Sequence, residues 1–277
     1  MGASLREQYL QVLGIDVWVP RPGAFASVVT APAGVQAPVT EQTPVAEQVP
    51  AEERMFVKEQ AVGAREGRPS AMTVVAGRAR ETSGDVQAAW DQLRAEVSAC
   101  VKCGLHSART QTVFGVGNTR AEWLVVGEAP GAEEDRKGEP FVGRAGQLLD
   151  AMLHAIGLSR DSNVYVANIL KCRPPNNRDP RPDEVACCMP YLVRQIALLQ
   201  PRLILAVGRI AAQNLLGTTA PLGRLRGQVH SFGELNTPLI VTYHPAYLLR
   251  TPADKRKAWE DLKFARAVFR QLASQAQ

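Results

Sequence analysis

The chain has 277 residues, enough for one or two domains, and 45% of them are hydrophobic, as in an ordinary globular protein. No run approaches the roughly 18 consecutive apolar residues of a membrane span, and the N-terminus lacks a secretion signal, so we expect a cytoplasmic protein with no membrane contact. The net charge of +5 is uneven, because residues 1–99 carry −3 and residues 100–277 carry +8, and a basic C-terminal part is compatible with a nucleic-acid partner.

The first 85 residues divide into two segments of different composition. Residues 4–19 (SLREQYLQVLGIDVWV) are rich in apolar side chains at helical spacing. Residues 20–85 are rich in Ala, Val, Pro, Gly, Gln and Glu and almost lack aromatic residues, so they bury too little apolar surface to offset chain entropy. We therefore predict a docking helix within residues 1–19, a disordered linker over 20–85 and a globular domain over 86–277. The alternative for the apolar segment is packing on its own domain.

The globular part alternates strand-like and helix-like segments. The strand-like runs are residues 123–126, 163–170, 203–207 and 239–242. The helix-like segments are residues 143–156, 183–200, 208–216 and 255–272. This alternation predicts an α/β fold with a mainly parallel sheet. Ligands of such sheets bind at the carboxyl ends of the strands, which directs attention to residues 127–131, 168–173 and 243–250.

The first of these segments is a tight turn, Gly127-Glu128-Ala129-Pro130-Gly131. Its glycines and proline expose backbone N–H groups and one carboxylate at the edge of the sheet. The turn lacks the G-x-x-x-x-G-K-[ST] spacing, and its acidic content would repel phosphate, so we exclude a nucleoside triphosphate site. The alternative is a plain connection between a strand and a helix.

Two polar side chains stand near the ends of later strands. Asn168 presents both a donor and an acceptor and can read the edge of a base, although a single Asn is otherwise often a turn residue. His244 can stabilise a developing anion or move a proton, although a lone His is more often structural. The segment that follows His244 ends in Leu248-Leu249-Arg250. Exposed leucines at a loop tip suit a wedge that enters a base stack, and the alternative is a buried helix start.

All five cysteines lie between Cys100 and Cys188. Cys100 and Cys103 form a C-x2-C pair, Cys172 lies far along the chain, and Cys187 is adjacent to Cys188. In a reducing cytosol, clustered cysteines ligate metal or do redox work more often than they form disulfides. Four thiolates can hold a tetrahedral zinc ion or an iron–sulfur cluster, and the spacing alone does not choose between the two. Buried free cysteines are the alternative.

The motifs in this order resemble those of the family 4 (iron–sulfur) uracil-DNA glycosylases. They are C-x2-C, GEAPG-x2-ED-x2-G-x-PFVG-x-AGQLLD, N-x3-CRPPNNR, a further Cys and HPAYLLR, and they extend from about residue 100 to 272. The resemblance implies a three-layer α/β/α sandwich around a four-stranded parallel sheet. It also implies a [4Fe–4S] cluster on Cys100, Cys103, Cys172 and Cys188, which leaves Cys187 as a spare thiol.

The resemblance further implies an activity, the hydrolysis of the N-glycosidic bond of a uracil flipped out of DNA, which leaves an abasic site and starts base excision repair. The implied uracil pocket consists of Gly127, Glu128, Ala129, Phe141, Asn168 and His244. Within it Phe141 would stack on uracil, Asn168 would bond the O4/N3 edge, and His244 would stabilise charge on O2. Glu128 would orient water and support the positive sugar, which makes Glu128, Asn168 and His244 the expected catalytic residues.

The DNA contacts implied by the resemblance lie on two segments. The basic residues expected to meet phosphates are Lys171, Arg173 and Arg178. The residues expected to fill or brace the vacated duplex are Leu248, Leu249 and Arg250. We expect a monomer that binds uracil-containing DNA, with a protein partner docking on residues 4–19.

Related activities are distinguishable by sequence. Glu128 favours family 4 over the neighbouring family that has an apolar residue there. Residues 225–230 lack the dense basic run of the relative that traps uracil-DNA covalently. The rival function is a non-catalytic iron–sulfur protein that binds damaged DNA, and it would show salt-sensitive DNA binding without release of a base.

Overall fold

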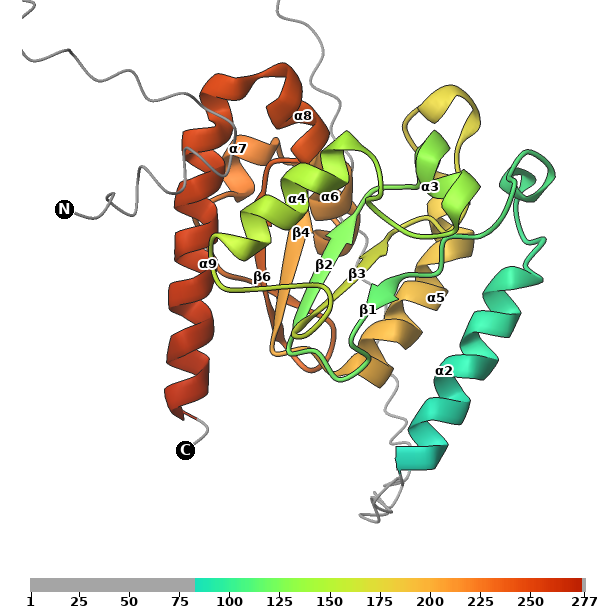
Figure 1. The fold of residues 1–277 in the computed structure, drawn as a ribbon, viewed down its shortest axis with the longest axis horizontal. Coiled ribbons are helices and arrows are strands. Elements are labelled where there is room, and N and C mark those ends of the chain that lie inside the picture. The colour runs from blue at the N-terminus through green and yellow to red at the C-terminus, as the bar shows by residue number, and fades with distance from the viewer. Residues whose placement is uncertain (1–82, 276–277) are drawn as a thin grey trace, which may run out of the picture. The chain divides into compact units, whose positions relative to one another are not determined.

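The computed structural model describes residues 83–275 (Figure 1). The docking helix predicted within residues 1–19 lies outside the described residues. The predicted linker over 20–85 also lies outside them, except that residues 83–85 begin the first described helix.

Helices and short strands alternate along the described chain. The helices are α2 (Ser83–Ser98), α3 (Ala132–Lys137), α4 (Arg144–His154), α5 (Pro182–Leu199), α6 (Arg209–Leu216), α7 (Leu222–Leu225), α8 (Pro245–Arg250) and α9 (Lys255–Gln275). Short 3-10 helices are η1 (Gly104–Ser107), η2 (Pro175–Asn177) and η3 (Pro252–Asp254). The strands are β1 (Val116–Gly117), β2 (Trp123–Gly127), β3 (Val164–Asn168), β4 (Leu203–Val207), β5 (His230–Phe232) and β6 (Thr237–Thr242).

The strands form one sheet in the order β1-β3-β2-β4-β6-β5. The four inner strands are parallel, and β1 and β5 pair antiparallel at the two edges. The four inner strands are those expected from the sequence, so the predicted parallel sheet is confirmed and the edge strands are additions. Both edge strands are only two or three residues long, too short for a periodic pattern to predict them.

Every residue of β2, β3 and β4 is buried, because helices cover both faces of the sheet. On one face α2, α5, α6 and α7 contribute to a core around Trp90, Tyr165 and Leu192. On the other face α4, α8 and α9 contribute to a core around Leu149, Met152 and Leu262. Figure 1 shows α9 and α5 on opposite sides of the sheet. The three-layer α/β/α architecture is therefore confirmed.

The register of the inner strands aligns their carboxyl ends. Gly127 at the end of β2 pairs with Asn168 at the end of β3, and Val207 of β4 pairs with Thr242 of β6. The segments that follow these strands are therefore brought to one edge of the sheet. Among residues 83–275, no helix has the length and apolar character needed to cross a membrane.

Candidate active site and cysteine centre

A cleft of about 710 Å³ opens at the carboxyl ends of the parallel strands. Its walls come from the turn after β2, the end of β3, the loop before α5 and the first residues of α6 and α8. This edge is where parallel α/β sheets bind ligands. The predicted site residues that line it are Glu128, Ala129, Phe141, Asn168, Arg178, His244 and Arg250.

Phe141 and Asn168 line the cleft and pack directly against Gly127, and this part of the cleft wall is called the slot below. A Cβ atom on Gly127 would lie 2.5 Å from the ring of Phe141 and would overlap the Oδ1 atom of Asn168, so only glycine allows this approach. Asn168 is 2% exposed, and its Oδ1 has no hydrogen-bond partner in the described structure. An unpaired buried acceptor costs about 1–3 kcal/mol, so this oxygen is suited to receive a donor from a ligand.

His244 faces the same slot. Its ring centroid lies 5.6 Å from that of Phe141, with 31° between the planes. The backbone N–H of Ala246 donates to Nδ1 over 3.1 Å. Burial, assisted by the charge of Arg250, lowers the pKa of His244 to about 4. The ring is therefore neutral near pH 7, and because Nδ1 accepts a hydrogen bond, the ring proton is on Nε2 and can be donated to a ligand.

Glu134 of α3 holds the two loops that form the slot. One carboxylate oxygen accepts from the backbone N–H of Gly131 over 3.1 Å. The other accepts from the N–H groups of Val142 and Gly143 over 3.0 and 3.3 Å. A carboxylate bound to three backbone donors is a strong clamp, and this one ties the turn after β2 to the segment that carries Phe141.

The backbone of Phe141 is fixed in an uncommon conformation. Its φ of 55° lies in the left-handed region, which is strained for a bulky residue and persists only when the surroundings enforce it. Arg160 donates to the carbonyl oxygens of Pro140 and Phe141 over 3.1 and 3.2 Å. Gly146 allows the close approach, since a Cβ there would overlap the carbonyl oxygen of Phe141. The aromatic face is thus set in place by contacts within the protein.

Glu128 projects from the turn into the cleft and is half-buried. Burial and the nearby carboxylate of Asp179 raise its pKa to about 7, and Arg209 opposes this shift. Asp179 and Arg209 are themselves joined, with 2.8 Å between Oδ2 and Nη2. A carboxyl group that titrates near neutral pH in a cleft is typical of functional sites.

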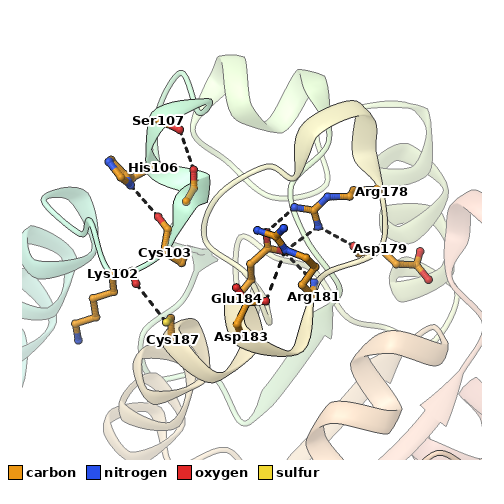
Figure 2. A network of polar contacts seen from close by, with 11 residues as sticks. Lys102, Cys103, His106, Ser107, Arg178, Asp179, Arg181, Asp183, Glu184 and Cys187 are labelled. Atoms are coloured by element: carbon orange, nitrogen blue, oxygen red, sulfur yellow. Dashed lines mark hydrogen bonds and ion pairs between the residues drawn. The ribbon is translucent and has the colours of Figure 1, made fainter.

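The loop before α5 is held by the fully buried carboxylate of Glu184 (Figure 2). Arg178 donates to both of its oxygens, over 2.9 and 2.5 Å, and the N–H of Arg181 donates over 2.8 Å. These contacts lower the pKa of Glu184 to about 2, mainly through the hydrogen bond from Arg178. The loop that carries Arg178 and Asp179 into the cleft is therefore anchored to the first turn of α5.

The five cysteines surround one small second cavity of about 10 Å³. They come from three segments: the turn after α2, the chain after β3 and the middle of α5. Burial raises the pKa values of Cys103 and Cys172 and raises that of Cys188 to about 11. No three His, Cys, Asp or Glu side chains within residues 83–275 are arranged to hold a single metal ion.

Hydrogen-bond donors point at two of these sulfur atoms. Arg109 donates from Nη1 to the Sγ of Cys172 over 3.2 Å, and the backbone N–H of Lys171 donates to the Sγ of Cys188 over 3.2 Å. Cys187 instead contacts the carbonyl oxygen of Lys102 over 3.4 Å (Figure 2). Donors of this kind stabilise thiolates, so Cys172 and Cys188 differ from Cys187 in their surroundings.

Lys171 does not lie where a phosphate contact requires it, and that expectation is corrected. The residue is 1% exposed, and its ammonium donates to the carbonyl oxygen of Asn168 over 2.9 Å and to Oε1 of Gln195 over 2.6 Å. Burial lowers its pKa to about 8. Lys171 therefore supports the end of β3, which carries Asn168, from inside the protein.

Leu248 is likewise not on the surface, since it is 1% exposed and packs in the core beneath α8. Leu249 and Arg250, which follow it, are exposed. The alternative of a buried helix start therefore holds for Leu248, and the surface of this helix tip is formed by the next two residues. Arg173 is half-exposed and donates to Asn177 over 2.7 Å.

Sequence reasoning missed several residues that shape the cleft. Glu134 had a signal, because it stands three residues after Gly131 at the start of a helix, where a glutamate commonly bonds back to the cap. Arg160, Asp179 and Arg209 had none, because each acts through a partner distant in sequence.

Comparisons with known proteins agree with this geometry. The sequence pattern of the Uracil DNA glycosylase superfamily matches residues 114–263, more than half of the chain. Three similar proteins are each named Type-4 uracil-DNA glycosylase. The protein from Archaeoglobus fulgidus is 47% identical over 179 residues, which is 62% of this chain and 89% of the relative.

The protein from Pyrobaculum aerophilum is 44% identical, over 60% of this chain and 87% of the relative. The protein from Sulfurisphaera tokodaii is 42% identical, over 64% of this chain and 84% of the relative. The matches cover most of each relative, and the family pattern over residues 114–263 includes every residue that lines the cleft. The chain belongs to the type-4 uracil-DNA glycosylases.

Proposed function

We propose that this protein excises uracil from DNA, by flipping the nucleotide into the cleft and hydrolysing its N-glycosidic bond to leave an abasic site. The observation that carries the proposal is the slot of Gly127, Phe141 and Asn168, which faces the neutral ring of His244. An aromatic face, a buried amide and a neutral imidazole donor together suit a flat, hydrogen-bonding base that leaves as an anion.

Asn168 selects uracil. Its unpaired Oδ1 accepts the N3–H of the base while its amide NH₂ donates to O4. Cytosine presents an acceptor at N3 and donors at C4, so both contacts fail, at a cost of about 1–3 kcal/mol for each unpaired group. Phe141 supplies the face on which the base stacks.

His244 stabilises the leaving group. As the bond to the sugar breaks, negative charge develops on the O2 atom of uracil, and the Nε2–H donates to it. The pKa of about 4 keeps the ring neutral, so the proton stays on His244 and the contact is a hydrogen bond to the anion. Glu128, in its ionised form, orients the attacking water and supports the positive charge of the sugar.

The exposed tip of α8 braces the duplex. Leu249 and Arg250 are the exposed residues there. Leu249 fills the space that the flipped nucleotide leaves, and Arg250 braces the duplex at its phosphates. Arg173 contributes to phosphate binding from the loop after β3, and Arg178 contributes less because Glu184 neutralises its charge.

Cys100, Cys103, Cys172 and Cys188 would hold a [4Fe–4S] cluster. The donor set fits, because the four thiols line one cavity and two of the sulfur atoms receive hydrogen bonds. When bound, the cluster supplies structural cross-linking between the three segments, and Cys187 remains a spare thiol.

The catalytic domain spans residues 86–277, acts as a monomer and works in the cytoplasm. Residues 4–19 bind a protein partner, and the linker tethers them to the domain. Deletion of residues 1–82 should leave uracil release from short DNA unchanged and abolish binding of any partner that the full chain retains. Loss of catalysis on deletion would contradict this division of the chain, and sedimentation of the full chain would test the monomer.

Uracil release by anaerobically purified protein tests the proposal. The substrate is an oligonucleotide with one uracil, and alkali then cleaves the strand at any abasic site. The wild type should give cleavage at uracil alone, and Asn168→Ala and His244→Ala should each lower the rate about 100-fold. His154→Ala, which changes an exposed histidine on α4, is the matched control and should be unaffected.

Full activity in both pocket variants would overturn the assignment of the site. DNA binding without base release by the wild type, at verified iron content, would replace excision with the non-catalytic damage-binding function.

A further inference from the structure

Asp179 and Arg209 form an ion pair at the wall of the cleft. Asp179 lies in the loop before α5, and Arg209 is the first residue of α6, so the pair connects two elements that are distant in sequence. The distance from Oδ2 to Nη2 is 2.8 Å, and both residues line the cleft together with Glu128.

The pair contributes little to the stability of the fold, because the side chains are 66% and 52% exposed and water screens such contacts. Its position is nevertheless well defined. Arg178, the neighbour of Asp179, is bound to the buried carboxylate of Glu184, and Figure 2 shows the carboxylate of Asp179 turned away from that of Glu184. The Asp179 charge is thus left to act within the cleft.

Glu128 is the group on which these two charges act. Burial raises the pKa of its half-buried carboxyl, Asp179 adds to that rise, and Arg209 opposes it. The other charged or titratable groups lining the cleft have partners or roles of their own. Glu134 binds three backbone N–H groups, Arg178 is paired with Glu184, and Arg250 acts on the neutral ring of His244. The hydroxyl of Tyr243 accepts from Arg226, and that of Tyr247 donates to Asp254.

We propose that Asp179 and Arg209 are positioning residues that set the charge of Glu128 during uracil excision, an inference that rests on the proposed function. Asp179 favours the protonated carboxyl, and Arg209 favours the carboxylate. Burial brings the change in charge of Glu128 into the neutral range, and the balance between these two charges adjusts it there. Because the carboxylate is the form that supports the sugar cation, the balance sets the pH at which excision begins.

Single-turnover uracil release, measured from pH 5 to 9, tests the inference. Asp179→Asn removes the like charge and frees Arg209, so the midpoint of the acid limb should move to lower pH. Arg209→Gln should move it to higher pH, and Arg209→Lys should restore it. A shift of about one pH unit corresponds to about a tenfold change in rate on that limb.

Opposite shifts of the acid midpoint in the Asp179 and Arg209 variants would show that the pair acts through its charges and not only as a structural link between two elements. A purely structural link would make both variants slower at every pH with an unchanged midpoint, and that result would overturn the inference. Glu122→Gln removes a comparably exposed ion pair with Arg202 just before β2, at the opposite end of that strand from Glu128, and should leave the midpoint unchanged.

A second readout does not depend on catalysis. The carboxyl carbon of Glu128, labelled with ¹³C and assigned with Glu128→Gln, can be titrated by NMR in the same folded variants. Opposite shifts of its titration midpoint would support the inference, and identical midpoints would overturn it even in a fully active enzyme. A wild type that titrates as expected but releases no uracil would instead overturn the proposed function.

Discussion

Glu128 and His244 face the same cleft, and burial favours the neutral form of both. For the acid this means a raised pKa of about 7, and for the base a lowered pKa of about 4. Between pH 5 and 9 the imidazole therefore stays neutral, and of these two groups only the carboxyl changes its charge. An acid limb of the catalytic rate in this range is therefore expected to belong to Glu128.

Replacing His244 should therefore lower the rate without moving the acid limb. We expect His244→Gln to reduce uracil release about 100-fold, because the donor to the leaving anion is displaced, with the acid midpoint of the wild type retained. Glu128→Gln should instead remove the acid limb. Rate profiles of the two variants check this, and a midpoint that moves in His244→Gln would show that the imidazole titrates in the working range.

The placement of Phe141, Asn168 and His244 at one cleft could be expected from the sequence, because each stands in a motif that carries the family resemblance, near the end of a strand or in a loop after one. The residues that hold them could not. Arg160 reaches the carbonyl of Phe141 from a loop nineteen residues later, and no spacing rule encodes that contact. The expectations for Lys171 and Leu248 are wrong for the converse reason. A basic residue and a leucine of a Leu-Leu-Arg tip are expected at the surface, and only tertiary packing shows that both are buried.

At the level of elements, the α3–α4 connection is a rigid support for the aromatic face. Its backbone is fixed by Glu134 from one side and Arg160 from the other, and α4 begins so close beneath it that Gly146 is required. The position of Phe141 is thus set by the packing of helices and not by its own side chain.

Gly146→Ala should damage this support. Its Cβ would overlap a carbonyl oxygen, so the backbone must shift, at a cost of about 2–3 kcal/mol in the free energy of unfolding. Gly223→Ala, where a Cβ meets nothing within 4 Å, is the matched control and should change stability by less than about 0.5 kcal/mol. Urea unfolding checks both, and equal stability of the two variants would contradict the argument.

Glu184 links the loop before α5 to that helix through its charge. Its pKa is lowered from the usual 4.5 to about 2, so its contribution to stability is complete above pH 4.5 and is lost as the pH falls towards 2. We expect Glu184→Gln to cost about 2 kcal/mol at pH 7, because the partner arginines can partly return to water. The difference from wild type in urea unfolding should shrink below pH 4.5.

Glu133→Gln, which removes only an exposed ion pair with Arg136, serves as the control. It should change the free energy of unfolding little, both at pH 7 and below pH 4.5. A cost for Glu184→Gln that stayed the same from pH 7 to pH 3 would show that shape and not charge explains the effect.

At the scale of the molecule, residues 100–277 carry a net charge of +8. The same part of the chain contains the cleft that the flipped nucleotide must enter. Affinity for DNA should therefore fall with salt, in proportion to the number of phosphates neutralised. Arg250 lies at the mouth of the cleft, whereas Arg202 lies beside the start of β4 and pairs with Glu122.

Arg250→Gln should reduce the slope of log affinity against log salt by about one, and Arg202→Gln should leave it unchanged. Fluorescence anisotropy with an undamaged oligonucleotide checks this. Equal slopes for Arg250→Gln and wild type would place the contact with DNA elsewhere on the surface.

The slot for the base is held by contacts within the protein itself, since Glu134, Arg160 and Gly146 fix the backbone around Phe141. Rearrangement of the protein should therefore contribute little to the free-energy cost of recognition. Most of that cost comes from flipping the nucleotide out of the DNA. The sequence and strandedness around the lesion should therefore govern turnover. A uracil opposite guanine, or in a single strand, leaves the helix at lower cost than one paired with adenine, and it should be removed first from a mixture of the three.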